Sequence, residues 1–234
     1  MKAFLLTAGL GTRLLPITKT TPKCLVEIGG KPLIHWWFDA MEQAGVTEVL
    51  INLHHLPKQV KDYVNKINTA IKVNYFMEEV LLGSAGTLRA NYDFVKEEDH
   101  FFIIYSDNLS SMKLEDLYSF HQGQAHLFSM ALFNSNNPTA CGIAVLDSKK
   151  TIIDFVEKPT HPKSPLANAG IYIAHPSIIE LIPKNKIPAD IGFDLLPQLI
   201  NHMSGWENED YLIDIGTLAN LAKARAEWPL QAGL

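Results

Sequence analysis

Short runs of apolar residues alternate, along the first half of the chain, with segments in which apolar residues recur every three or four positions. Such helix-period segments follow Pro32 and Pro57 and predict two helices, because proline fits the first turn of a helix. The runs of consecutive apolar residues predict buried strands, and they lie at 3–6, 49–53, 73–76 and 101–105. Strands alternating with helices indicate a doubly wound α/β fold with a mixed, mostly parallel sheet.

The pattern changes after about residue 125, where strand-like runs are separated mostly by turns. These runs predict a smaller, partly antiparallel sheet and lie at 127–133, 142–146, 152–156 and 170–174. Further helical segments are expected at 176–181, 194–203 and 217–228. Since the chain has neither an internal repeat nor a long linker, we expect one domain over 1–234, with lobes at about 1–125 and about 126–234.

The composition of the chain limits the kinds of molecule that it could bind and the place in which it could work. The 234 residues carry a formal charge of −5 and no basic stripe, so we expect no nucleic acid polymer as partner. The longest apolar stretch falls short of the roughly 20 residues that a membrane span needs, which argues against a membrane protein. Cys24 and Cys141 fit neither a disulfide framework nor a zinc site. We interpret them as free thiols and expect a cytoplasmic protein.

The segment from Thr7 to Lys23, TAGLGTRLLPITKTTPK, directly follows the first strand. A loop in this position can bind phosphate through its backbone N–H groups, and glycine lets that backbone approach closely. It matches neither the dinucleotide fingerprint, which needs a third glycine, nor the P-loop, which ends in Gly-Lys-Ser/Thr. Arg13 and Lys23 add two permanent cations, which suit a triphosphate better than a single phosphate.

This segment resembles the signature of the sugar-1-phosphate nucleotidyltransferases, the nucleoside-diphosphate-sugar pyrophosphorylases. The matching positions are Gly9, Gly11, Thr12, Arg13, Pro16, Thr18, Pro22 and Lys23. Further landmarks of that family follow in the expected order, at 82–87, 105–108, 157–159, 168–172 and 214–217. The resemblance implies a Rossmann-like nucleotidyltransferase fold whose antiparallel sub-sheet binds the sugar. The C-terminal β-helix domain of many larger relatives is not expected.

The resemblance also implies a set of site residues. Arg13, Lys23 and Asp107 are the expected catalytic residues, and Asp107 and Asp214 are the expected ligands of Mg²⁺. Nucleotide contacts are expected at Leu6, Ala8, Gly9, Gly11, Thr12, Glu78, Gly83 and Ser84. Sugar-phosphate contacts are expected at Asn108, Gly142, Glu157, Lys158, Asn168, Gly170 and Asp194. Lys158 would neutralise the sugar phosphate, and Glu157 would accept hydrogen bonds from sugar hydroxyls.

The implied reaction is attack of a sugar-1-phosphate oxygen on the α-phosphorus of a nucleoside triphosphate, with release of pyrophosphate. Since a phosphate nucleophile is already ionised near neutral pH, no general base is needed. Arg13 is expected to bind the β- and γ-phosphates, and Lys23 to stabilise charge on the α-phosphate. Asp107 follows a buried strand closely, at the end of an open sheet where ligands bind. For Asp214, capping the N-terminus of the helix that follows is an alternative to binding the metal.

The base and the sugar stay open at this stage. A carboxylate at Glu78 accepts hydrogen bonds only, which suits the adjacent N–H donors of guanine and favours GTP. The guanylyltransferase branch suggests a manno-configured hexose or heptose 1-phosphate. The alternatives within the family are a uridylyltransferase acting on an amino-sugar 1-phosphate and a cytidylyltransferase acting on phosphocholine.

Two alternatives come from other classes. A non-catalytic nucleotide-sugar-binding regulatory subunit would keep the fold without turnover, although it would not need the whole set of charged residues. A dehydrogenase is disfavoured by the absent third glycine. The resemblance leaves a homodimer open. The pair His54-His55 lacks a partner at metal-ligand spacing, so we interpret it as structural.

Overall fold

The computed structural model describes residues 1–231, which form two compact units. Unit 1 is built from three segments, 1–2, 81–104 and 115–209. Unit 2 is built from 3–80, 105–114 and the chain from 210 onward. These interleaved segments do not coincide with the lobes expected on either side of residue 125, because residues far apart in sequence pack together. The single domain and the substrate assigned to each lobe remain predictions.

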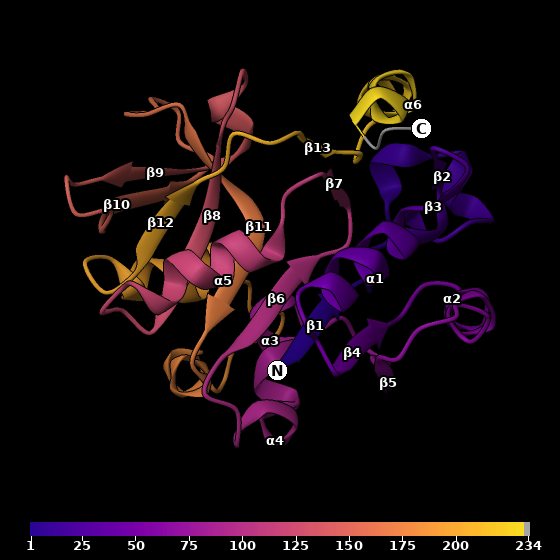
Figure 1. Cartoon of the computed structure of the whole chain (residues 1–234), viewed down its shortest axis with the longest axis horizontal. Helices are drawn as coiled ribbons and strands as arrows, with labels where there is room; N and C mark the ends of the chain where they lie inside the picture. The colour runs from indigo at the N-terminus through magenta and orange to yellow at the C-terminus, as the bar shows by residue number, and fades with distance from the viewer. Residues whose placement is uncertain (232–234) are drawn as a thin grey trace. The chain divides into compact units, whose positions relative to one another are not determined.

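Unit 2 contains three main strands in the order β1, β4, β5, and β4 runs parallel to β5 (Figure 1). Two small antiparallel sheets, β2 with β3 and β7 with β13, complete its strands. The elements are β1 (Lys2–Leu6), η1 (Thr12–Leu14), η2 (Ile17–Lys19), η3 (Lys23–Leu25), β2 (Glu27–Ile28), β3 (Lys31–Pro32), α1 (Leu33–Gln43), β4 (Glu48–Leu53), α2 (Pro57–Val64), β5 (Lys72–Met77), β7 (Asn108–Ser110), β13 (Leu212–Asp214) and α6 (Leu218–Gln231).

The two helices predicted after prolines begin where expected. α1 follows Pro32 and buries one apolar face, and it ends just before Gly45, whose φ of +70° suits a helix C-terminus. Pro57 opens α2. The helix ends at Val64 and buries Val60 and Val64.

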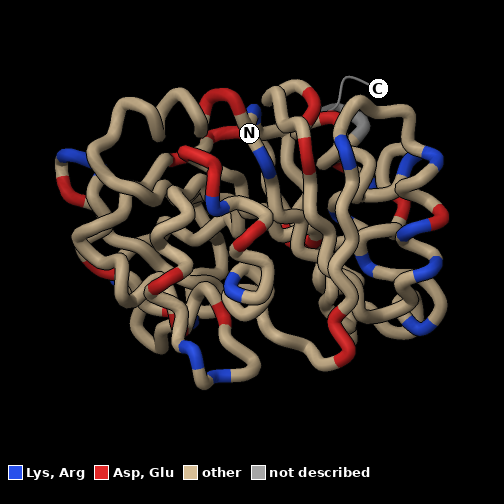
Figure 2. The backbone as a smooth tube through the Cα atoms, turned by 90° about the horizontal axis from the view of Figure 1, so that it is seen from below, with Lys and Arg blue, Asp and Glu red and all other residues tan. Residues whose placement is uncertain are grey.

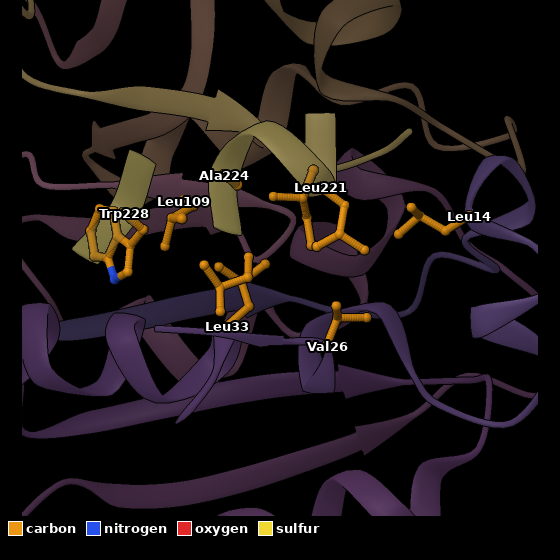
Figure 3. Packing of buried hydrophobic residues seen from close by; sticks show 9 residues of the cluster. Leu14, Val26, Leu33, Leu109, Leu221, Ala224 and Trp228 are labelled. Atoms are coloured by element: carbon orange, nitrogen blue, oxygen red, sulfur yellow. The ribbon is translucent and has the colours of Figure 1, made fainter. Parts of the chain in front are cut away.

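A buried cluster in unit 2 ties the loop after β1 to the C-terminal helix (Figure 3). Leu14 from η1 and Leu33 from α1 pack in the same cluster as Leu109 from β7 and Leu221 from α6. Each of these four side chains is at most 2% exposed. Full burial of a leucine side chain contributes about 1.5–3 kcal/mol, so this cluster anchors the loop that carries Arg13.

Unit 1 has mostly antiparallel strands. Here β11 pairs antiparallel with β6, β8 and β9, and β9 pairs antiparallel with β10. In contrast, β12 pairs parallel with β8. The elements are α3 (Ser84–Ala90), α4 (Tyr92–Val95), β6 (Phe101–Tyr105), α5 (Leu114–Gln122), β8 (Phe128–Asn134), η4 (Pro138–Ala140), β9 (Gly142–Leu146), β10 (Ile152–Glu157), β11 (Leu166–Ala174), η5 (Pro176–Leu181), η6 (Ile191–Leu195), η7 (Leu196–Leu199) and β12 (Ser204–Glu207).

The predicted α/β class, with parallel and antiparallel strands and small antiparallel sheets, is confirmed. The helix expected at 194–203 is wrong. A π-helical turn, η6, is followed there by a short 3-10 helix, η7. Pro197 lies at the start of η7, and a proline inside an α-helix removes a backbone hydrogen bond and clashes with the preceding turn.

The adjacent side chains of Trp36 and Trp37, both on α1, pack within unit 2. Trp37 is 2% exposed and donates to the carbonyl of Asn108 over 2.8 Å. Trp36 donates to the carbonyl of Ile28 and meets the Trp228 ring edge to face. Cys24 and Cys141 are free thiols, as expected.

Lys and Arg segments and Asp and Glu segments are both scattered along the backbone in Figure 2. Within residues 1–231, none of the helices combines the length and the apolar character that crossing a membrane requires.

Candidate functional site

Four of the predicted charged residues meet in unit 2. The Nζ of Lys23 lies 2.7 Å from Asp107 Oδ2 and 3.2 Å from Asp214 Oδ1. Arg13 lies 3.5 Å from the other carboxylate oxygen of Asp214. The Lys23 side chain is only 11% exposed, whereas those of Arg13 and Asp214 are 66% and 42% exposed. We call these four side chains the charged cluster; solvent and small ligands can reach it.

The small sheet of β7 and β13 brings the two carboxylates together. Asp107 immediately precedes β7, and Asp214 is the last residue of β13, opposite Asn108. The backbone N–H of Ile215 donates to the carbonyl of Asp107 over 3.1 Å, which extends the pairing by one step. Two acids that are 107 positions apart in the sequence therefore stand side by side at one end of a two-stranded sheet.

The loop after β1 is held in place by side-chain contacts. Gly11 has a φ of +64°, and a Cβ atom there would lie 2.8 Å from Thr18 Cγ2. Thr18 is 1% exposed and donates from its Oγ1 to the carbonyl of Gly11 over 2.8 Å. Gly11 therefore combines a left-handed backbone with a close approach, and both favour glycine. Gly9 and Thr12 are exposed in the same loop.

Asp107 and Asp214 fit the chemistry of a hard divalent cation. Both are carboxylates, both are partly exposed, and both lie within 3.2 Å of one ammonium group, so they can reach one common ion. The described residues hold no group of three or more His, Cys, Asp or Glu side chains placed for a metal. Mg²⁺ accepts such a site, because it keeps waters and binds through one or two carboxylates together with phosphates.

Asp214 also has a local structural role. Its Oδ1 accepts from the backbone N–H of Gly216 over 2.6 Å, and its carbonyl accepts from the Asn220 side chain. A Cβ atom at Gly216 would lie 2.7 Å from the Arg13 guanidinium and 2.8 Å from Asp214 Oδ1. The helix α6 is capped by Thr217 instead, whose Oγ1 accepts from the backbone N–H of Asn220 over 3.1 Å. The capping role considered for Asp214 is therefore wrong.

Glu78, the predicted reader of the base, is almost fully buried. It is 3% exposed, it directly follows β5, and its Oε1 accepts from Asn52 Nδ2 over 2.8 Å. Asn52 is 4% exposed, and its Oδ1 accepts from the backbone N–H of Thr7 over 2.7 Å. Leu6 and Ala8, the neighbours of Thr7, are also buried. The carboxylate is thus held by side chains at the ends of neighbouring strands.

Glu157 lies against two glycines in unit 1. A Cβ atom would lie 2.5 Å from Glu157 Oε2 at Gly142 and 2.8 Å from it at Gly192. Burial raises the pKa of Glu157, Lys158 lowers it and Asp190 raises it further. The space around this carboxylate therefore depends on the lack of side chains at both glycines.

Lys158 has an uncommon backbone conformation. Its φ is +50°, which for a residue with a side chain costs roughly 1–2 kcal/mol. Its backbone N–H donates to the carbonyl of Cys141 over 3.0 Å, and its exposed Nζ is 4.0 Å from Glu157 Oε1. Backbone strain of this kind persists where surrounding structure enforces it, and it is frequent at functional sites.

The predicted nucleotide contacts at 83–84 pack against the segment 189–191. A Cβ atom at Gly83, whose φ is +79°, would lie 2.2 Å from the Ala189 carbonyl oxygen. The Ser84 hydroxyl donates to Asp190 Oδ2 over 2.9 Å and accepts from the backbone N–H of Ile191 over 2.8 Å. Gly83 and Ser84 therefore hold the segment 189–191 against the start of α3 in unit 1. Their contact with a nucleotide remains a prediction.

The other predicted sugar contacts also have structural partners. Asn168 accepts from the Gly170 N–H and donates to the Tyr172 hydroxyl, across an irregularity in the pairing of β11 with β8. Asp194 accepts from Lys186 and from the backbone N–H of Asp190. Burial would raise the pKa of Asp194, but the Lys186 and backbone hydrogen bonds lower it. Their contact with a sugar remains a prediction.

The structural interpretation of His54-His55 agrees with their contacts. His54 Nδ1 lies 2.8 Å from the carbonyl of Glu78, and His55 Nε2 lies 2.7 Å from the carbonyl of Thr18. Asn52, Asp190 and Gly192 also contact the predicted residues, although none of the three was predicted from the sequence. Asn52 offers one signal in the sequence, since it is a polar residue near the end of a strand whose other residues after Glu48 are apolar.

Comparisons with known proteins agree with this architecture. A UDP-glucose pyrophosphorylase in complex with UDP-glucose superimposes with a TM-score of 0.84 at 23% identity, over 97% of each chain. HddC from Yersinia pseudotuberculosis superimposes with a TM-score of 0.81 at 24% identity, over 97% of this chain and 99% of its own. This chain therefore shares its fold with these two proteins.

The family model described as nucleotidyl transferase matches residues 2–229. The chain belongs to the nucleotidyl transferase family. It is 33% identical to a mannose-1-phosphate guanyltransferase of Schizosaccharomyces pombe over 223 residues, 92% of this chain. A mannose-1-phosphate guanylyltransferase catalytic subunit beta of Dictyostelium discoideum is 31% identical over 222 residues. The chain spans 61% of the length of each of these two relatives.

Proposed function

We propose that this protein transfers a nucleotidyl group from a nucleoside triphosphate, preferentially GTP, to a sugar 1-phosphate. A manno-configured hexose or heptose 1-phosphate is the favoured acceptor, and the products are a nucleoside-diphosphate-sugar and pyrophosphate. The observation that carries the proposal is the charged cluster, in which two cations and two carboxylates from distant segments meet beside the glycine loop. The reaction would supply precursors for glycan synthesis.

The reaction exchanges one phosphoryl bond for another. A sugar-phosphate oxygen forms a bond to the α-phosphorus, the bond from that phosphorus to the bridging β-oxygen breaks, and the electron pair leaves with pyrophosphate. Because both reactants are anions, the barrier depends on charge and alignment. Arg13 binds the leaving pyrophosphate, and Lys23 stabilises the α-phosphate as it reacts.

Asp107 and Asp214 would hold Mg²⁺, because both offer carboxylate oxygens, the ligands that this ion prefers. When bound, the ion neutralises phosphate charge and orients the phosphate oxygens. Lys23 contacts both carboxylates and has a flexible four-carbon stem, so it can turn from them to the phosphates of a nucleotide.

Glu157 and Lys158 are the proposed contacts for the sugar phosphate. The exposed ammonium of Lys158 attracts the phosphate, and its strained backbone supports a functional rather than a purely structural role. The raised pKa of the Glu157 carboxyl follows from burial beside Gly142 and Gly192. In the ionised form this carboxylate accepts hydrogen bonds from sugar hydroxyls.

Two observations favour GTP. The relatives with the matches reported above are guanylyltransferases by name, and Glu78 is a hydrogen-bond acceptor in a fixed orientation. Uridylyl transfer to an amino sugar or cytidylyl transfer to phosphocholine remain the alternative substrate pairs. Since Cys24 and Cys141 are free thiols, we place the reaction in the reducing cytoplasm.

A matrix of nucleoside triphosphates against sugar 1-phosphates, with Mg²⁺ and a pyrophosphate readout, tests the proposal directly. We expect the fastest release with GTP and mannose 1-phosphate or a manno-heptose 1-phosphate. Release with UTP alone would overturn the base assignment. No release from any pair, from protein that binds GTP and Mg²⁺, would favour a non-catalytic binding subunit.

A further inference from the structure

One buried side chain of unit 2 joins the phosphate loop to the predicted base reader. Asn52 is 4% exposed and lies in β4, whose other central positions are apolar. Burying an amide is unfavourable unless its donors and its acceptor are paired. The Asn52 side chain pairs on both sides, with Thr7 on one and Glu78 on the other.

The contact with Thr7 fixes which way the Asn52 amide points. A backbone N–H can only donate, so the atom 2.7 Å from Thr7 N must be the oxygen Oδ1. The amide nitrogen Nδ2 then faces Glu78 and donates to its Oε1 over 2.8 Å. The Thr7 hydroxyl also donates to the backbone carbonyl of Asn52, which strengthens the first link.

These three residues lie where three neighbouring strands end. Thr7 follows β1, Asn52 is the next-to-last residue of β4, and Glu78 follows β5. Open α/β sheets bind ligands at the carboxyl ends of their strands. Thr7 is also the residue from which the glycine loop departs, through Ala8 and Gly9. Asn52 thus stands between the element expected to bind phosphates and the residue expected to read the base.

We propose that Asn52 is a positioning residue that couples the phosphate loop to Glu78, so that base and triphosphate are recognised in one fixed geometry. The inference rests on the proposed function for the identity of the ligand. Asn52 need not touch the nucleotide. It acts by holding the Thr7 backbone on one side and the Glu78 carboxylate on the other.

Two substitutions separate the two links. Asn52→Leu has a similar shape and removes both hydrogen bonds. Asn52→Asp keeps an oxygen that accepts from Thr7, but it loses the donor to Glu78 and places a second carboxylate beside the first. Glu78→Gln changes only the proposed base reader. Tyr63→Phe is the matched control, because it removes a partly buried hydrogen bond of unit 2, between Tyr63 and His35, that involves neither Thr7 nor Glu78.

Equilibrium binding of GTP, UTP and pyrophosphate, measured by titration calorimetry with Mg²⁺, reports on each link without requiring turnover. We expect Asn52→Leu to weaken pyrophosphate binding and to reduce the preference for GTP over UTP, each by about tenfold, the equivalent of one good hydrogen bond. Asn52→Asp and Glu78→Gln should reduce the base preference with little effect on pyrophosphate. Tyr63→Phe should change neither.

The double variant Asn52→Asp/Glu78→Gln provides a rescue. The introduced amide can donate to the introduced carboxylate, which restores the bond with its polarity reversed, so the melting temperature should recover relative to Asn52→Asp alone. The preference for GTP should stay low, because the Glu78 carboxylate is absent from this variant. The proposal is overturned if Asn52→Leu lowers the melting temperature but leaves both the GTP preference and the pyrophosphate affinity at wild-type values. Wild-type protein that binds these ligands without turnover would instead count against the proposed function alone.

Discussion

The charged cluster of unit 2 and the Glu157 region of unit 1 hold their functional groups in different ways. In the charged cluster, side chains are held by other side chains of opposite charge, with Lys23 between Asp107 and Asp214. In the Glu157 region, backbone packing determines the space, since glycines at 142 and 192 leave room for one carboxylate. The difference suggests that paired charges can exchange partners when ligands bind, whereas a pocket built by backbone keeps its shape.

Removing one acid of the charged cluster should have the largest effect. Asp107→Asn keeps the shape of the side chain but loses its charge, so transition-state stabilisation worth several kcal/mol is lost and turnover should fall by about a thousandfold. The side chain is 36% exposed, so the melting temperature should change little. Pyrophosphate release and thermal unfolding measure the two effects.

The matched control for this substitution is Asp62→Asn. Asp62 is also a partly exposed carboxylate of unit 2 that pairs with a lysine, Lys58, but it lies on α2 outside the charged cluster. Its substitution should leave turnover near the wild-type value. If Asp107→Asn and Asp62→Asn behaved alike, Asp107 would have no place in the active site.

Unit 1 also contains a buried histidine that should make stability depend on pH. His121 is 2% exposed, and its ring lies 2.8 Å from the Ser129 hydroxyl and 3.0 Å from His100. Burial, followed by repulsion from His100, lowers the pKa of His121 to about 4 from 6.5. The unfolded state therefore binds more protons as the pH falls below 6.5, and roughly 3 kcal/mol of stability should be lost between that pH and about 4.

Urea unfolding at several pH values measures this loss. His121→Gln should give a flatter dependence of the unfolding free energy on pH across that interval, even if its stability at neutral pH is lower. The same slope in the variant and the wild type would assign the acid sensitivity to other groups.

Filling the backbone-built space beside Glu157 should have an intermediate effect. At Gly142 a Cβ atom would lie 2.5 Å from Glu157 Oε2 and 2.6 Å from Phe155 Cζ. Gly142→Ala should cost about 1–3 kcal/mol of stability through overpacking, and it should raise the KM for the sugar phosphate with little change in the KM for the nucleotide. Steady-state kinetics with each substrate varied in turn measure this selectivity.

Gly123→Ala is the comparison for that variant, because its Cβ atom would lie 3.4 Å from its nearest neighbour, at ordinary contact distance. It should leave both KM values unchanged. Equal increases in the two KM values for Gly142→Ala would contradict a pocket specific to the sugar phosphate.

Relieving the backbone strain at Lys158 should have the smallest effect on stability. Lys158→Gly removes the cost of a side chain at φ +50°, offset in part by the greater freedom of glycine in the unfolded chain, so we expect a gain of roughly 0.5 kcal/mol. Loss of the ammonium should nevertheless raise the KM for the sugar phosphate. Chemical unfolding and steady-state kinetics measure the two quantities.

Lys150→Gly is the control for Lys158→Gly, because Lys150 also has a positive φ, of +65°, but lies outside the proposed site. It should show the gain in stability without the effect on KM, since its exposed ion pair with Glu207 contributes little. An unchanged KM for the sugar phosphate in Lys158→Gly would show that this lysine does not bind the sugar phosphate.

The pattern of apolar residues was sufficient to predict the strands and the helix in which that pattern is strongest. The strands β1, β4, β5 and β6 and the helix α1 lie close to their predicted bounds, because runs of apolar residues and a proline at a helix start are local signals. The expected helix at 194–203 failed, since the proline within it favours a succession of shorter turns. The glycine loop could also be predicted from local signals, because its motif residues all lie within the short segment from Gly9 to Lys23.

The α/β class and the family could be inferred from the order of residues along the chain, which also predicts the charged residues of the site. The contacts of Lys23 with Asp107 and Asp214, of Glu157 with Gly142 and Gly192, and of Asn52 with Thr7 and Glu78 emerge only in the folded protein. These contacts join residues that are far apart in the chain. Sheet pairing and side-chain packing determine them, and no local pattern of residues records which distant partners will meet.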